Sequence, residues 1–219
     1  MKRQLSEQRK SLIEATKRYH ASFAGSAAEQ FLGNRGLAAE RVTKYRFGYV
    51  EDPLPGHERY RGKLVIPYLR RNEKDDWTVV SIRFRCARDG CNHEGHNKYD
   101  TMTGDTPRLY NTTEIVGNHN RIAITEGELD AVCATLSGVP AIGVTGAQTW
   151  KRHYKEAFIG YERVHVLADG DDAGTGMAEA IAKDLPNASV HKMPPGEDVN
   201  SFVLANGADA LRERIGWDG

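Results

Sequence analysis

The chain of 219 residues has few cysteines and no long apolar run. Its three cysteines, an odd number, argue against a disulfide framework and predict reduced thiols. No apolar stretch approaches the roughly 20 residues that cross a bilayer. Residues 1–20 are charged throughout and lack the apolar core of a signal peptide. These absences predict a cytoplasmic protein without a membrane partner.

The formal net charge of zero conceals a division of charge between the two halves of the chain. Residues 1–113 contain 21 Lys and Arg against 14 Asp and Glu, whereas residues 114–219 contain 9 against 16. A basic half beside an acidic half suits a protein that binds a polyanion with one lobe and metal ions with the other. Solvated surfaces that happen to differ in sign are the simpler alternative. We expect two domains, 1–113 and 114–219.

The two halves also differ in their pattern of helices and strands. The first half reads as helices followed by two neighbouring strands, 62–69 and 77–86, which predicts an α+β lobe. In the second half strands and helices alternate, which predicts a doubly wound parallel sheet and places the chain in the α/β class. The expected strands there are 121–125, 139–144, 163–168 and 188–193, and the expected helices are 128–137, 148–158, 173–184 and 198–205.

Two of these strands stop at a carboxylate that is followed by glycine. Glu126 follows the strand 121–125, and Asp169 and Asp171 follow the strand 163–168. Ligands of open α/β sheets collect beyond the carboxyl ends of the strands, so these three side chains are expected at one edge. Clustered carboxylates repel one another unless cations neutralise them, and hard oxygen ligands suit Mg²⁺ or Mn²⁺. The sequence therefore predicts a divalent-metal site for phosphate chemistry.

The acidic segments carry a family resemblance. Residues 126–130 (EGELD) and 169–174 (DGDDAG) resemble the two motifs of the TOPRIM domain, which topoisomerases, bacterial-type (DnaG-like) primases, some nucleases and recombination mediators share. Residues 31–37 (FLGNRGL) and 47–49 (FGY) resemble the opening of the bacterial-type primase catalytic core. The resemblance extends over roughly residues 26–215, and both acidic motifs stand in the family's order.

The resemblance implies a DNA primase core, a nucleotidyltransferase that synthesises short RNA primers on single-stranded DNA from NTPs with Mg²⁺ or Mn²⁺. Glu126, Asp169 and Asp171 are the implied catalytic residues. The family usually has Lys-Asp-x-Asp where this chain has Glu197 and Asn200, so a second metal ion is expected to bind weakly. The implied metal ligands are Glu126, Asp130, Asp169, Asp171 and Asp198.

Basic residues of the first half are candidates for contacts with nucleotide or DNA. Alternation in the second expected strand places Arg83 and Arg85 on one face, together with Val79. Two arginines so spaced can contact adjacent phosphates, although a half-exposed sheet with solvated arginines is the alternative. The resemblance adds Lys98 and Arg108 as phosphate or nucleotide contacts.

Two modules of the bacterial primases are not expected in this chain: the zinc ribbon that reads initiation sites and the helicase or helicase-binding domain. The resemblance therefore implies a separate replicative helicase or zinc-ribbon protein as partner, and a bacteriophage origin with activity in the host cytoplasm. A TOPRIM-type metal-dependent nuclease and a non-catalytic DNA-binding mediator of recombination or replication are the alternative functions. A topoisomerase is excluded because it needs a strand-cleaving tyrosine domain and a much longer chain.

A separate motif carries ligands of another type. Cys86, Cys91, His93 and His96 offer four zinc-type ligands within a short loop. Their spacing is tighter than in the usual zinc finger, where two ligand pairs stand far apart. A structural zinc ion and a cluster of exposed polar residues are the two interpretations.

Overall fold

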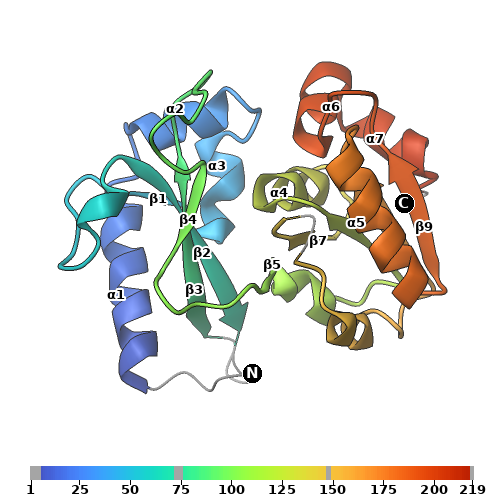
Figure 1. Cartoon of the computed structure of the whole chain (residues 1–219), viewed down its shortest axis with the longest axis horizontal. Coiled ribbons are helices and arrows are strands. Elements are labelled where there is room, and N and C mark those ends of the chain that lie inside the picture. The colour runs from blue at the N-terminus through green and yellow to red at the C-terminus, as the bar shows by residue number, and fades with distance from the viewer. Residues whose placement is uncertain (1–5, 72–75, 147–148, 218–219) are drawn as a thin grey trace. The chain divides into compact units, whose positions relative to one another are not determined.

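The computed structural model describes residues 6–71, 76–146 and 149–217 (Figure 1). The chain divides into two compact units, Met1–Thr106 and Pro107–Gly219. Each unit has its own sheet. Within the described ranges, no helix combines the length and apolarity needed to cross a lipid bilayer.

The first unit is a four-stranded antiparallel sheet with helices packed on it (Figure 1). Leu12 and Tyr19 of its first helix share a core cluster with Ile82 and Phe84 of the sheet, because apolar side chains recur on one face of each element. The strands follow in the order β1 (Gly48–Tyr49), β2 (Lys63–Arg71), β3 (Trp77–Cys86) and β4 (Tyr99–Thr101), and the helices are α1 (Ser6–Ala21), α2 (Ala27–Gly33) and α3 (Ala39–Val42), with 3₁₀ turns η1 (Thr43–Tyr45) and η2 (Glu58–Tyr60).

A β-bulge in β3 makes one expectation wrong. The pairing register between β2 and β3 shifts at Val80: Tyr68 pairs with Ser81 and Leu69 with Val79, so β3 has one extra residue here. Strict alternation placed Val79 on the same face as Arg83 and Arg85. The extra residue reverses the alternation at that point, so Val79 is fully buried in the core beside Ile82.

The second unit is a five-stranded sheet of order β5-β7-β6-β8-β9, in which β5 is an antiparallel edge strand and the other strands pair in parallel. The expected α/β class and doubly wound sheet are confirmed. The strands are β5 (Leu109–Tyr110), β6 (Arg121–Thr125), β7 (Ala141–Val144), β8 (Arg163–Ala168) and β9 (Ala188–Lys192). The helices are α4 (Glu128–Leu136), α5 (Asp172–Asp184), α6 (Val199–Asn206) and α7 (Ala208–Ile215), with 3₁₀ helices η3 (Thr112–Val116) and η4 (Arg152–Ala157).

The buried core of this sheet lies under α5 and η4. Ile122 and Ile124 of β6 pack with Met177 and Ile181 of α5 and with Phe158 after η4. α5 connects β8 to β9 toward one edge of the sheet, and α4 connects β6 to β7 toward the other edge. Because both crossovers are right-handed, α4 covers the face of the sheet opposite to α5. The central strands β6, β7 and β8 are therefore buried on both sides, which explains their nearly continuous apolar sequence, whereas the edge strand β9 is only partly buried.

The domain boundary and one helix of the second unit differ from the sequence expectation. The expected domain boundary followed residue 113, but the second unit begins at Pro107, because β5 pairs with β7. The expected helix 148–158 begins outside the described residues, and its described part is the 3₁₀ helix η4. A six-residue 3₁₀ helix suffices to return the chain to β8.

Candidate metal centre and basic surface

The acidic residues lie at the topological switch point of the parallel sheet. β6 and β8 are neighbouring parallel strands, and the chain leaves them toward opposite edges, through α4 to β7 and through α5 to β9. Glu126 directly follows β6, and Asp169 directly follows β8. The carboxyl ends of such diverging strands form the crevice in which α/β proteins bind ligands.

Backbone hydrogen bonds join the loop after β8 to the loop before α6. The Gly170 N–H donates to the carbonyl oxygen of Glu197 at 2.8 Å, and the Gly196 N–H donates to the carbonyl oxygen of Gly170 at 3.2 Å. A Cβ on Gly170 would lie 1.8 Å from the carbonyl oxygen of Pro194. Gly170 is therefore required because the two backbones touch, and its φ is not positive. This contact brings Asp198, at the start of α6, toward Asp169.

Asp130 is held between α4 and α6. It lies in the first turn of α4, is only 8% exposed, and its Oδ1 accepts a hydrogen bond from the backbone N–H of Asn200 at 3.0 Å. A Cβ on Gly127 would lie 2.4 Å from Asp130 Oδ2, so this glycine leaves space for the carboxylate. The glycine of the first acidic motif thus has a packing role.

Asp171 and Asp198 are the N-caps of α5 and α6. Asp171 Oδ1 accepts from the Gly174 N–H at 2.8 Å, and Asp198 Oδ1 accepts from the Ser201 N–H at 2.7 Å. Capping satisfies a helix N–H group with one oxygen of each carboxylate. The second oxygen of each is left for a cation, so capping and metal binding are compatible here.

Asp169 has a strongly perturbed environment. Its Oδ1 is buried and has no hydrogen-bond partner among the described residues. Burial and the negative charge of its neighbours raise the pKa of Asp169 to about 8. A divalent cation would relieve this repulsion, and the residues fit such an ion. The neighbouring carboxylates, in decreasing order of effect, are Asp130, Glu126, Asp198 and Asp171.

The one close set of metal-type ligand side chains found among the described residues does not include the five carboxylates. In the part of the chain that the structure describes, the one set of three or more Asp, Glu, Cys or His side chains whose ligand atoms all lie within 4.8 Å of one another contains cysteines and histidines. Mg²⁺ keeps several waters and commonly uses only one or two carboxylates together with substrate phosphates. An open acidic cluster suits that mode of binding.

The predicted basic residues do not all belong to one unit. Arg83 and Arg85 both contact the Tyr99 ring, with guanidinium carbons 4.4 and 5.3 Å from its centroid. Arg85 is only 8% exposed, and its Nε donates to the Tyr99 hydroxyl at 2.9 Å. Lys98 is exposed directly before Tyr99, whereas Arg108 lies in the second unit. Arg83 and Lys98 are therefore more accessible to a phosphate than Arg85.

The cysteine and histidine residues of the loop between β3 and β4 converge. Cys86 is buried and the other three are half-buried, which disagrees with a cluster of exposed polar residues. Burial of the Cys86 thiol raises its pKa, but contacts with His96, Arg88 and Cys91 outweigh this effect and lower the pKa to about 7. The thiol therefore loses its proton more readily than an ordinary cysteine.

Two side chains that were not among the predicted site residues lie beside these groups. Glu197 Oε2 is buried with no hydrogen-bond partner among the described residues, and Glu197 directly precedes Asp198, which was the available signal. Arg88 Nη2 lies 3.5 Å from His96 Nε2. No sequence pattern marked Arg88, because only the folded loop brings it to the histidine.

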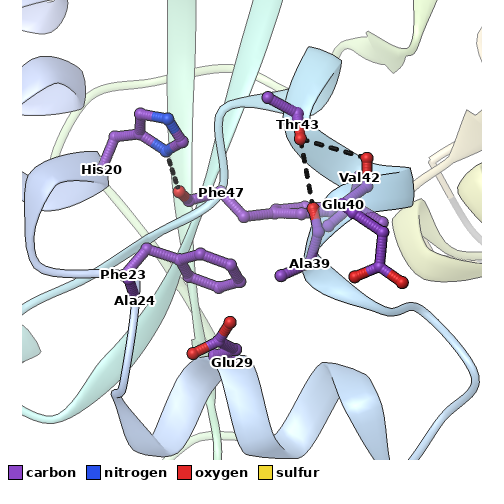
Figure 2. A pocket seen from close by; sticks show the side chains of 9 residues that line it. All are labelled: His20, Phe23, Ala24, Glu29, Ala39, Glu40, Val42, Thr43 and Phe47. Carbon is purple, nitrogen blue, oxygen red and sulfur yellow. Dashed lines mark hydrogen bonds between the residues drawn. The ribbon is translucent and has the colours of Figure 1, made fainter.

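A pocket of about 270 Å³ in the first unit involves none of the predicted site residues (Figure 2). Phe23, Val42 and Phe47 contribute apolar surface, and Glu29 and Glu40 contribute carboxylates. Carboxylates repel the phosphates of a nucleotide. This pocket is therefore a poor candidate for an NTP site.

Comparison with known proteins agrees with this geometry. A family model described as Toprim-like matches residues 123–203, which include all five carboxylates. Gene 57 protein of Mycobacterium phage D29 is 52% identical over 71% of this chain and 99% of its own length. A DNA primase of Pseudomonas aeruginosa is 32% identical over 88% of this chain and 34% of its own length. A solved DnaG primase catalytic domain bound to single-stranded DNA superposes with a TM-score of 0.73 at 21% identity, over 97% of this chain and 82% of that one.

Residues 123–203 are Toprim-like, the fold is that of the DnaG primase catalytic cores, and the chain belongs to one family with Gene 57 protein of Mycobacterium phage D29. Gene 57 protein of Mycobacterium phage D29 is a relative that it matches over nearly the whole of that protein. The chain spans about a third of the length of the Pseudomonas DNA primase.

Proposed function

We propose that this chain is the catalytic core of a DNA primase, a DNA-directed RNA polymerase that synthesises short RNA primers on single-stranded DNA during replication. The observation that carries the proposal is the cluster of carboxylates around half-buried Asp169 at the switch point of the Toprim unit. Relatives named DNA primase and a structural neighbour bound to single-stranded DNA support it.

The cofactor of this reaction is Mg²⁺ or Mn²⁺. A bound divalent ion would lower the pKa of the attacking 3′-hydroxyl and neutralise charge on the leaving pyrophosphate. Asp169 would hold the ion together with the Asp171 and Asp198 oxygens that capping leaves available. Glu126 would accept the hydroxyl proton or share an ion. Asp130, fixed by the Asn200 N–H, adds negative potential to the crevice.

The basic residues would bind the nucleic acid and the nucleotide. Arg83 and Lys98 present charge on the first unit, Arg85 supports Arg83 through their shared contact with Tyr99, and Arg108 contributes from the second unit. Electrostatic contact with phosphates supplies most of the sequence-independent affinity for a single strand. A separate replicative helicase or zinc-ribbon protein would direct the enzyme, and similarity to a phage protein supports activity in the host cytoplasm.

One assay separates the primase from a nuclease and from a non-catalytic DNA-binding mediator. The purified chain is incubated with single-stranded DNA, labelled NTPs and Mg²⁺ or Mn²⁺, with and without a chelator. We expect short RNA products that disappear with the chelator and with Asp169→Asn. Degraded DNA would establish a nuclease instead, and DNA binding without either product would establish a mediator.

A further inference from the structure

The loop between β3 and β4 gathers two thiols and two imidazoles. Cys86 Sγ lies 3.3 Å from His96 Nε2, and Cys91 Sγ lies 3.6 Å from the same nitrogen. One ligand atom from each of Cys86, Cys91, His93 and His96 lies within 4.8 Å of all the others. A single imidazole nitrogen cannot make good hydrogen bonds to two thiols at once, so hydrogen bonding does not explain this convergence.

The two sulfur-to-nitrogen distances at His96 match a tetrahedral zinc site. Zinc bonds to sulfur at about 2.3 Å and to imidazole nitrogen at about 2.0–2.1 Å, so the tetrahedral angle separates sulfur from nitrogen by about 3.6 Å. The two observed separations from His96 Nε2 are close to this value. Two thiolates and two imidazoles select zinc over the hard cations that the carboxylates of the second unit suit.

The histidines are oriented for ligation. His96 Nδ1 lies 3.4 Å from the carbonyl oxygen of Glu94, a contact that favours a proton on Nδ1 and a lone pair on Nε2 toward the sulfurs. His93 Nδ1 is buried and has no hydrogen-bond partner within the described part of the chain. His93 also has a left-handed backbone, with φ of 61°. Such a conformation persists only where other interactions hold it.

The loop is anchored at both sides of the cluster. The Cys86 N–H donates to the carbonyl oxygen of Lys98 at 2.9 Å. Asp89 accepts hydrogen bonds from Asn34 at 2.7 Å and from Arg35 at 2.8 Å, which ties the loop to the end of α2. An ion bound between these anchors would fix the whole segment.

The charges around the cluster also suit this ion. The cations of Lys98, Arg85 and Arg88 lie near enough to His93 to interact with it electrostatically. A zinc ion with two thiolates and two neutral imidazoles has no net charge. It can therefore hold basic side chains in place without adding to their mutual repulsion.

We propose that Cys86, Cys91, His93 and His96 hold a structural zinc ion that fixes the basic loop between β3 and β4. The proposal concerns the first unit alone and does not depend on primase activity. The ion orders the segment that carries Arg88 and Lys98.

Zinc content and Co²⁺ spectroscopy of the purified full chain test the proposal. We expect one zinc ion per chain, and after replacement by Co²⁺ the intense visible absorption of a tetrahedral thiolate site. Cys91→Ser should lose most of the bound zinc and the thiolate-to-Co²⁺ absorption. Cys91 is half-buried, so this variant is expected to fold, and circular dichroism checks it.

Two control variants locate the ion. Cys133→Ala removes the buried thiol of α4, and Asp169→Asn removes the central carboxylate of the acidic cluster. Both should retain one zinc ion and the Co²⁺ absorption. A wild-type chain that binds no zinc even when titrated under reducing conditions would overturn the proposal. Zinc that persists in Cys91→Ser, or that is lost with Asp169→Asn alone, would do the same.

Discussion

Substitutions of Asp171 can distinguish an effect on catalysis from an effect on folding. Its Oδ1 caps α5 by accepting the Gly174 N–H at 2.8 Å, while its charge contributes to the field around Asp169. Asp171→Asn keeps an oxygen at the cap and removes the charge. Asp171→Ala removes both. Comparing the two variants therefore distinguishes a metal ligand from a helix cap.

The expected magnitudes differ in the two assays. Loss of an N-cap costs about 1 kcal/mol, which lowers the melting temperature by roughly 2–6 °C for units of this size. Asn caps about as well as Asp, so Asp171→Asn should melt within about 2 °C of wild type. Loss of a metal-binding charge should reduce the rate of primer synthesis by about 100-fold or more in both variants. A 100-fold decrease in rate requires the activation free energy to rise by only about 3 kcal/mol.

The measurements are thermal unfolding and primer synthesis on single-stranded DNA with Mg²⁺. Asp172→Asn is the matched control, because Asp172 is an exposed carboxylate in the same first turn of α5. It should retain activity and stability. Primer synthesis by Asp171→Asn at the wild-type rate would refute the assigned role, and a loss of stability equal to that of Asp171→Ala would refute the capping argument.

Three further outcomes are expected. Gly170→Ala should destabilise the protein by roughly 2 kcal/mol or more, because the new Cβ would overlap the facing backbone. In the control Gly176→Ala, in α5, the new Cβ meets no atom within 4 Å, so this variant should be neutral or stabilising. Chemical unfolding compares the two variants, and equal stability would contradict the close approach at Gly170. Burial, the neighbouring His191 and nearby arginines lower the pKa of His165 to about 4, so its ring should stay neutral until the pH falls to that value. The stability that the neutral ring contributes should be lost as pH falls from about 6.5 to about 4. An NMR titration of His165 with a midpoint near 6.5 would contradict this. Lys98→Ala should weaken binding to single-stranded DNA and reduce its salt slope by about 0.7, while the exposed Lys183→Ala should change neither; equal slopes for both variants would exclude a phosphate contact at Lys98.

Much of the second unit could be predicted because its local patterns agree with its tertiary structure. Parallel strands that are buried on both faces give short apolar runs, and each run that precedes an acidic residue ends where the sheet ends. The positions of Glu126 and Asp169 after β6 and β8 follow from those runs. The convergence on Asp169 also follows, because neighbouring parallel strands end at one edge.

Other features depend on contacts between segments that are distant in sequence. The register of β3 changes at Val80, and no local pattern indicates that a bulge turns Val79 into the core. The unit boundary depends on β5, which has only two residues and exists because β7 offers it an open edge. Neither feature has enough residues to produce a periodic pattern.

The sequence by itself determined which chemical groups are available: carboxylates after two apolar strands, and thiols with imidazoles in one loop. Residue type and strand period are local properties, so they can be read in order along the chain. The tertiary structure decided how these groups meet. It set the close approach of the Pro194 backbone that leaves no room for a side chain at position 170, the dual use of Asp171 as cap and charge, and the approach of two sulfurs to His96. These depend on the distance between backbones, which only packing fixes.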